Sequence, residues 1–158
     1  MVVLAGAVVV VDQLTKLWAV SALGGRAPVA VVGELIQLRL TYNAGAAFSF
    51  AERFTWVLTV ITAAVVVTIS IVAVRVRSRA WMVSLGLVLG GAATHLLDRM
   101  FREPGLARGH VVDFIDYFGF FVGNVADIAL VVGVSLAVLL NLRGVLLSGP
   151  AEPARVGR

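Results

Sequence analysis

The sequence predicts an all-α membrane protein of four transmembrane helices with a small extracytoplasmic β-sheet. Of its 158 residues, 60% are hydrophobic and only 14% are charged, so a soluble fold would leave much of this apolar surface in water. Four apolar segments each approach the roughly 20 residues that a helix needs to cross about 30 Å of hydrocarbon. They are residues 1–23, 54–74, 80–97 and 117–142.

The first apolar segment has a second interpretation, as a secretory signal peptide. It has no basic stretch ahead of its apolar run, and Asp12 and Lys16 interrupt that run. A signal peptide places its positive charges first and keeps its apolar core uncharged. We therefore interpret residues 1–23 as a transmembrane helix and keep the signal peptide as the weaker alternative.

The short loop after the second segment predicts the orientation. Residues 75–79 hold three arginines and no acidic residue, which is typical of a cytoplasmic loop. Arginines also occur in the opposite loops, so the charge density of this short loop and its lack of acids decide the assignment. Both termini are then cytoplasmic, and residues 24–53 and 98–121 are extracytoplasmic. We expect one membrane domain, residues 1–147, followed by a disordered cytoplasmic tail, residues 148–158, rich in Pro, Gly, Ala and Arg.

The two extracytoplasmic segments have different patterns. In residues 24–53, the apolar Ile36, Leu38 and Leu40 alternate with polar residues, and this period of two predicts a strand. An amphipathic sheet at the membrane surface would use such a pattern, with its apolar face toward lipid or the helices. The segment 98–121 ends in aromatic residues, which favour the bilayer interface.

Ionisable side chains in or beside transmembrane helices are functional candidates, because each costs about 2.5 to 3.5 kcal/mol on insertion scales. Those predicted on the outer side are Asp12, Lys16, Asp98, Arg99, Asp113, Asp116 and Asp127. Asp12 and Lys16 are at i and i+4, so we interpret them as a mutually neutralising pair that fixes the first helix. For Asp98 and Arg99, a solvated helix end and support of a site are equal alternatives. His95 is a hydrogen-bonding partner in our interpretation, since no second histidine or cysteine is suitably spaced for a metal.

The strongest candidates for chemistry are Asp113 and Asp127. Asn124 precedes Asp127 by three residues, which fits a helix N-cap with an acid at the third position, near the positive end of the helix dipole. Two carboxylates in a low-dielectric site share a proton, so one can accept a proton from water while the other polarises a peptide carbonyl. The alternative is that Asp127 only caps the helix and Asp113 is an ordinary loop acid.

Five blocks of residues, taken together, resemble the lipoprotein signal peptidase family, the type II signal peptidases of bacteria. The blocks are Asp12-Gln13-Leu14-Thr15-Lys16, Asn43-Ala44-Gly45-Ala46-Ala47-Phe48, Gly90-Gly91 through Asp98-Arg99, Val111-Val112-Asp113-Phe114 and Asn124-Val125-Ala126-Asp127. One block alone is weak, whereas five in the family's order are highly specific. The resemblance implies a catalytic aspartate dyad at Asp113 and Asp127. The polar residues that support the dyad are then Asp12, Lys16, Asn43, Gly45, Arg99, Asn124 and Ala126, to which we add Asp98 and His95.

The resemblance also implies a function. A member of this family is an intramembrane aspartyl endopeptidase of the bacterial cytoplasmic (inner) membrane. It removes the signal peptide from diacylglyceryl-modified prolipoproteins by cutting just before the lipidated cysteine. The resemblance implies contact with membrane lipid, a short lid near the active site, sensitivity to globomycin-type cyclic peptides, and no metal or organic cofactor. The sequence has no cluster of basic residues interspersed with aromatic ones that would form a nucleic-acid-binding groove, so we expect no nucleic-acid partner.

The third block departs from the family pattern, which has Gly-Asn where this chain has Thr94 and His95. Unlike asparagine, histidine can acquire a charge, and a positive charge near the dyad would lower the carboxylate pKa values and shift the pH optimum or weaken the enzyme. Two alternatives therefore stay open. One is an inactive paralogue that binds lipidated proteins without cutting them, and the other is a small proton-coupled transporter, since intramembrane carboxylates also relay protons.

Overall fold

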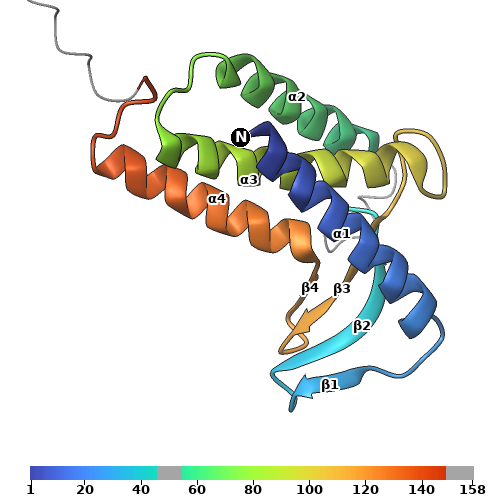
Figure 1. Ribbon diagram of the computed structural model, residues 1–158. Coiled ribbons are helices and arrows are strands. Elements are labelled where there is room, and N and C mark those ends of the chain that lie inside the picture. The colour runs from blue at the N-terminus through green and yellow to red at the C-terminus, as the bar shows by residue number, and fades with distance from the viewer. Residues whose placement is uncertain (46–54, 149–158) are drawn as a thin grey trace, which may run out of the picture.

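The computed structural model describes residues 1–45 and 55–148. Within these ranges the chain forms four helices and one antiparallel sheet (Figure 1). The helices are α1 (Val2–Leu23), α2 (Thr55–Ala73), α3 (Arg79–Phe101) and α4 (Val125–Leu142). Each of them is long and apolar enough to cross a membrane, which confirms the predicted fold class. The predicted tail lies outside the described residues from residue 149 onward.

The helix α3 occupies the middle of the bundle and contacts α1, α2 and α4. Glycines on α3 allow this close packing. A Cβ atom on Gly90 would lie 2.7 Å from the side chain of Val8 on α1, and one on Gly91 would lie 2.6 Å from that of Leu130 on α4. Small residues at such positions let transmembrane helices approach closely, and they place the polar face of α3 within reach of both neighbours.

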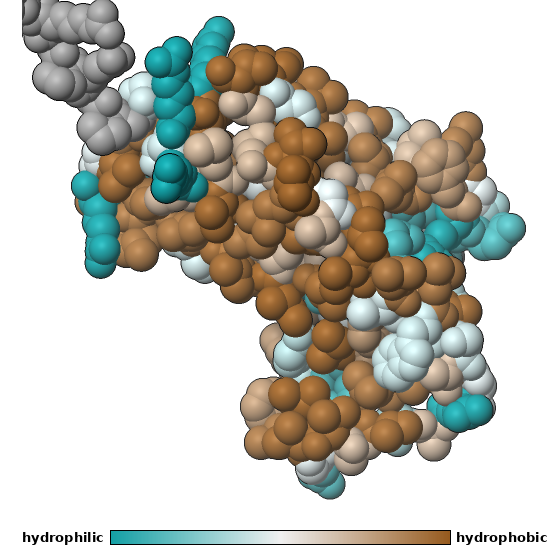
Figure 2. Space-filling model, in the orientation of Figure 1, coloured by the Kyte–Doolittle hydropathy of each residue, from teal (hydrophilic) through white to brown (hydrophobic). Residues whose placement is uncertain are grey.

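The outer surface of the bundle is apolar. Figure 2 shows hydrophobic residues over the helices on the visible face. Hydrophilic residues lie at the end with the loop between α2 and α3, and also at the opposite end, near the loop after α3 and on the sheet. The chain after α4 pairs with this loop, because the backbone N–H groups of Arg77 and Ser78 both donate to the carbonyl oxygen of Leu147, at 2.9 and 3.1 Å. The three arginines of residues 75–79 are therefore at the same end of the molecule as the end of α4.

The sheet lies at the other end of the bundle (Figure 1) and has the order β1-β2-β3-β4. Its strands are β1 (Val29–Val32), β2 (Ile36–Asn43), β3 (Val111–Tyr117) and β4 (Phe121–Gly123). Leu38 and Leu40 of β2 pack against a small core of Ala19, Leu23 and Phe114, which joins α1 to the sheet. The predicted strand is therefore confirmed, with its apolar face toward the helices.

Two predicted boundaries were wrong. The fourth helix begins at Val125 and not at 117, because residues 117–123 complete the hairpin of β3 and β4 and Asn124 caps the helix. Phe118 and Gly119 make the turn with φ angles of 58° and 70°. The third helix continues to Phe101 instead of ending at 97, since the charged side chains in its last turns have partners inside the protein.

Candidate active site

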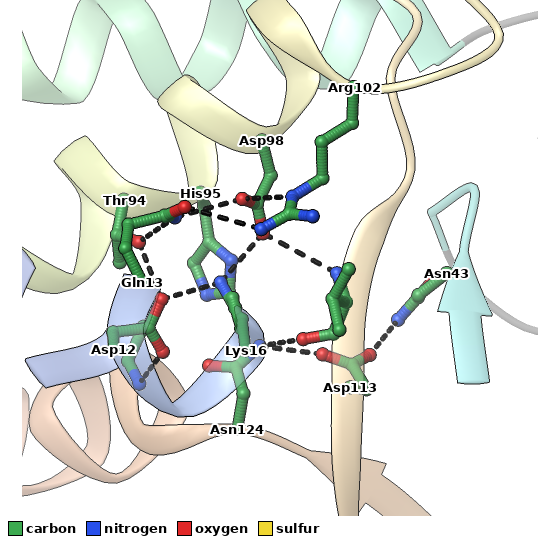
Figure 3. Close-up of polar contacts among 12 residues, drawn as sticks. Asp12, Gln13, Lys16, Asn43, Thr94, His95, Asp98, Arg102, Asp113 and Asn124 are labelled. Carbon is green, nitrogen blue, oxygen red and sulfur yellow. Dashed lines mark hydrogen bonds and ion pairs between the residues drawn. The ribbon is translucent and has the colours of Figure 1, made fainter. Parts of the chain in front are cut away.

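A buried cluster of charged side chains joins α1 to α3 at the end of the bundle next to the sheet. Figure 3 shows Lys16 between Asp12 and Asp98, with its Nζ atom 2.6 Å from Asp12 Oδ2 and 2.6 Å from Asp98 Oδ2. All three side chains are fully buried. Arg102 adds a second cation, with its Nε atom 2.7 Å from Asp98 Oδ1. The predicted pair of Asp12 and Lys16 is thus confirmed as part of a larger cluster of two acids and two bases, and Asp98 is no solvated helix end.

Neutral side chains complete this cluster. Thr94 Oγ1 donates to Asp12 Oδ2 at 2.5 Å, and Gln13 Nε2 donates to Thr94 Oγ1 at 2.8 Å and to Asp98 Oδ1 at 2.9 Å. No supporting role was predicted from the sequence for Gln13, Thr94 or Arg102. The positions of Thr94 and Arg102, each four residues from Asp98, are the signal that could have revealed them.

The cluster also fixes the start of α4 and the strand β3. The backbone N–H of Ala126, in the first turn of α4, donates to Asp12 Oδ1 at 2.9 Å. The backbone N–H of Val112 donates to Asp98 Oδ2 at 3.4 Å. The two elements that carry Asp113 and Asp127 are therefore anchored to the same buried charges. The supporting role of Asp12, Lys16 and Ala126 stays a prediction, and this geometry agrees with it.

Asn124 connects the two candidate carboxylates. Its Oδ1 atom accepts the backbone N–H of Asp127 at 3.1 Å, and Asp127 Oδ2 accepts the backbone N–H of Asn124 at 2.8 Å. This reciprocal pair is a capping box, as the sequence predicted. The Nδ2 group of Asn124 is then left to donate to Asp113 Oδ1, at 2.6 Å.

A second amide holds Asp113 from the neighbouring strand. Asn43 Nδ2 donates to Asp113 Oδ2 at 2.9 Å (Figure 3). The orientation of this amide is fixed, because Asn43 Oδ1 accepts the backbone N–H of Gly45 at 2.8 Å. Gly45 has a φ of 115°, a conformation that side-chain-bearing residues rarely adopt. The predicted roles of Asn43 and Gly45 are consistent with this turn, and Ala46 to Phe48 of the same block lie outside the described residues.

The environment of Asp113 raises its pKa. Burial raises the pKa of Asp113 to about 6, and the negative charge of Asp127 adds to the rise, while the hydrogen bonds from Asn43 and Asn124 oppose it. A carboxyl group that titrates so close to neutral pH can act as a general acid under cellular conditions.

Asp113 and Asp127 line one cavity of about 300 Å³. The predicted site residues that also line it are Asn43, Gly45, His95 and Arg99. His95 Nε2 lies 3.1 Å from Asp127 Oδ1, and Arg99 Nη1 donates to the carbonyl oxygen of Ala44 at 3.3 Å. The cavity therefore holds two carboxyl groups and polar neighbours, the side chains that acid and base catalysis by a carboxylate pair needs. Among residues 1–45 and 55–148, no group of three histidine, cysteine or acidic side chains could hold a metal ion.

Asp116, the other acid of this segment, faces away from the cavity. Asp113 and Asp116 are three residues apart on one strand, so their side chains point to opposite faces of the sheet. Asp116 Oδ2 lies 3.1 Å from Arg39 Nε, and Asp116 Oδ1 accepts the backbone N–H of Gly119 at 2.9 Å. Its partners give it a structural role in the sheet.

A second, apolar pocket of about 280 Å³ adjoins the first cavity. It is lined by Tyr117, Phe121, Asp127, Ile128, Val131 and Val132. Asp127 and Phe121 line both cavities, so one carboxylate lies at the border between a polar space and an apolar one.

Comparison with known proteins gives the family. Residues 4–143 match the family described as signal peptidase (SPase) II. The chain belongs to this family. It is 46% identical over 142 residues to the lipoprotein signal peptidase of Rhodococcus jostii (strain RHA1), covering 90% of this chain and 72% of that protein. It is 43% identical over 148 residues to that of Leifsonia xyli subsp. xyli (strain CTCB07), covering 93% of this chain and 68% of the relative.

Solved structures show the same fold. One, described as a bacterial membrane enzyme, has a TM-score of 0.71 and 24% sequence identity, and the match covers 98% of this chain and 93% of the other. A second of the same description has a TM-score of 0.72 at 24% identity, covering 89% and 91%. Membership of the signal peptidase II family confirms the resemblance found in the five blocks, and it implies a protease with several membrane spans.

Proposed function

We propose that the protein is an intramembrane aspartyl endopeptidase that removes the signal peptide from diacylglyceryl-modified prolipoproteins, cutting just before the lipidated cysteine. One observation carries the aspartyl mechanism: Asp113 and Asp127 line a single cavity, and Asn124 binds both of them. The family and the names of its relatives, lipoprotein signal peptidases, support the prolipoprotein substrate.

The proposed reaction needs one proton on the pair. The ionised carboxylate takes a proton from water, whose oxygen adds to the carbonyl carbon of the scissile bond, while the protonated carboxyl gives its proton to the carbonyl oxygen. The product of this step is a neutral diol. When the C–N bond breaks, the newly protonated carboxyl gives its proton to the leaving nitrogen and a diol hydroxyl returns one to the other carboxylate. The pair is again singly protonated, and one water has been consumed.

The apolar pocket supports a lipid-modified substrate. Its walls include the apolar side chains Ile128, Val131 and Val132 of α4. These side chains can pack against an acyl chain, which an unlipidated peptide lacks. Asp127 at its border would place the lipidated cysteine next to the dyad. A globomycin-type cyclic peptide would compete with the substrate for the same two spaces.

The orientation of the chain supports a site outside the cytoplasm. The three arginines of residues 75–79 favour a cytoplasmic position for the end of the bundle opposite the sheet. Both termini would then be in the cytoplasm, and the cavity would face the outer side of the bacterial cytoplasmic membrane. A signal peptide that spans this membrane presents its C-terminal end there.

The function is tested with purified protein in detergent and one prolipoprotein in two forms, with and without the diacylglyceryl group. We expect release of the signal peptide from the lipidated form alone, and mass spectrometry should find the cut just before the modified cysteine. Cleavage in detergent needs no ion gradient, which separates a peptidase from a transporter. Stable binding of the lipidated form without any cut would instead identify an inactive paralogue.

The pH dependence of cleavage should report the proton on Asp113. Above its pKa of about 6, Asp113 loses the proton that the carbonyl oxygen must receive. We therefore expect kcat/KM, which reports the free enzyme, to fall as pH rises through about 6. The corresponding fall of kcat should lie at higher pH, because bound substrate excludes water and so disfavours a negative charge on Asp113 beside ionised Asp127. A value of kcat/KM that stays constant from about pH 5 to pH 8 would contradict the assignment of the essential proton to Asp113.

A further inference from the structure

The dyad of Asp113 and Asp127 has a third ionisable side chain in contact with it. His95 on α3 reaches across to α4, where its Nε2 atom lies 3.1 Å from Asp127 Oδ1. The other oxygen of this carboxylate, Oδ2, accepts the backbone N–H of Asn124 at 2.8 Å. Oδ1 is therefore the oxygen of Asp127 that the imidazole contacts.

The surroundings of the ring indicate which nitrogen carries the hydrogen. An ionised carboxylate only accepts hydrogen bonds, so with Asp127 ionised the contact places a hydrogen on Nε2 of His95. The Nδ1 atom is buried and has no hydrogen-bond partner among the residues that the structure describes. A hydrogen on Nδ1 would be a buried donor without an acceptor, which is unfavourable. Both observations favour the form of the ring whose hydrogen is on Nε2.

The two carboxylates of the dyad differ in their access to water. The side chain of Asp127 is 26% exposed, whereas Asp113 is buried, with 2% of the whole residue exposed. Asp127 is also in the first turn of α4, at the positive end of the helix dipole. Water therefore reaches Asp127 more readily, and burial favours the neutral form of Asp113.

We infer that His95 is a positioning residue of the dyad, whose Nε2–H keeps Asp127 as the ionised, water-activating member and leaves the shared proton on Asp113. The inference rests on the proposed function and adds the division of roles between the two aspartates. The histidine has no proton to give or take in the cleavage steps. Its direct hydrogen bond is to Asp127.

Other charges around His95 do not replace this contact. Asp113 on β3 and Arg99 on α3 line the same cavity. On α1, Lys16 pairs with Asp12 and with Asp98, and Asp98 also pairs with Arg102. The helix α2, over Thr55–Ala73, carries no ionisable side chain. The charged cluster beside α1 is thus internally neutralised, and Arg99 binds the backbone of Ala44. Among residues 1–45 and 55–148, His95 is the ionisable side chain that makes a direct hydrogen bond to Asp127.

The first test compares the pH profile of cleavage in wild type, His95→Gln and His95→Phe. Glutamine keeps a donor on an Nε2 atom but cannot titrate, and phenylalanine keeps a ring without a donor. We expect His95→Gln to retain kcat within about threefold. We expect His95→Phe to shift the acidic limb of the kcat profile upward by about one pH unit, because ionised Asp127 has lost a hydrogen-bond donor. At the acidic end this is about a tenfold loss of kcat, with KM unchanged within about twofold. Thermal unfolding of each purified variant checks that it is folded.

Two outcomes of this experiment overturn the inference. In the first, the profile of His95→Phe superimposes on that of wild type. In the second, KM rises about tenfold while both limbs stay in place, which would make His95 a substrate contact instead. A wild-type enzyme that cuts no prolipoprotein at any pH would overturn the proposed function itself.

A second test reads the hydrogen bond without any substrate. The chain has two histidines, so a His110→Asn background leaves His95 as the single imidazole for ¹⁵N NMR in detergent. We expect the tautomer with hydrogen on Nε2, and we expect Asp127→Ala to abolish this preference while the matched Asp116→Ala leaves it intact. A hydrogen on Nδ1, or a spectrum indifferent to Asp127→Ala, would overturn the inference whatever the cleavage assay shows.

Discussion

Replacing either Asp113 or Asp127 by asparagine is expected to lower kcat by about 10³-fold or more, because each change removes one half of the acid and base pair. Both variants should stay folded. In Asp127→Asn, the amide oxygen can still accept the backbone N–H of Asn124 and so preserve the capping box. In Asp113→Asn, an amide oxygen can keep one of the two donors that now bind Asp113, from Asn43 and Asn124, and the loss of the other should lower the melting temperature modestly.

The matched control for the dyad is Asp116→Asn, the same substitution on the opposite face of β3. It removes an ion pair with Arg39, whose side chain is 45% exposed. The side chain of Asp116 is only 6% exposed, so loss of the pair should lower stability. Asp116 lies on the face of the sheet away from the cavity, so we expect cleavage by the folded protein within about threefold of wild type. The measurement is the rate of signal-peptide release beside circular dichroism and thermal unfolding of each variant. An equal loss at Asp116, or substantial activity in Asp113→Asn or Asp127→Asn, would show that a different carboxylate performs the chemistry.

The helices of this protein could be predicted from the sequence where apolar length alone decides. The segments 1–23 and 54–74 agree with α1 and α2 within about one residue. The prediction failed at residues 117–123, because a short apolar strand and the start of an apolar helix have the same composition. What separates them is the turn at Phe118 and Gly119 and the pairing of β3 with β2 and β4, and neither is visible in hydropathy.

In the candidate site, contacts between residues close in the sequence could be predicted, whereas contacts between different helices could not. Spacing predicted the pair of Asp12 and Lys16 and the cap made by Asn124 on α4, since both depend on residues three or four apart. The contact of His95 with Asp127 and that of Lys16 with Asp98 depend on which faces of α3 meet α4 and α1. That choice follows from the close packing at glycines along α3, a property of three-dimensional fit and not of any local pattern.

Lys16→Ala is expected to destabilise the protein more than any other single change in the charged cluster, by about 3 to 5 kcal/mol, the usual effect of breaking a buried ion pair. Lys16 is fully buried between Asp12 and Asp98, so its removal leaves two buried carboxylates with one cation, Arg102. Asp12→Ala should be milder, because Lys16 then keeps Asp98 as a partner. It still removes the acceptor for the N–H of Ala126 and so loosens the start of α4.

The double variant Asp12→Ala with Lys16→Ala separates charge balance from lost packing. It leaves Asp98 paired with Arg102, one acid and one base, so it should recover part of the stability that Lys16→Ala loses. The free energy of unfolding in detergent is the measurement, and kcat of the folded fraction is read in parallel. We expect kcat to change much less than stability, because the cluster acts on the dyad by holding α4 and β3 in place. Single variants that unfold like wild type but cannot cleave would instead give Lys16 and Asp12 a role in the chemical step. A double variant whose loss of unfolding free energy equals the sum of the two single losses would show that the two side chains do not compensate each other.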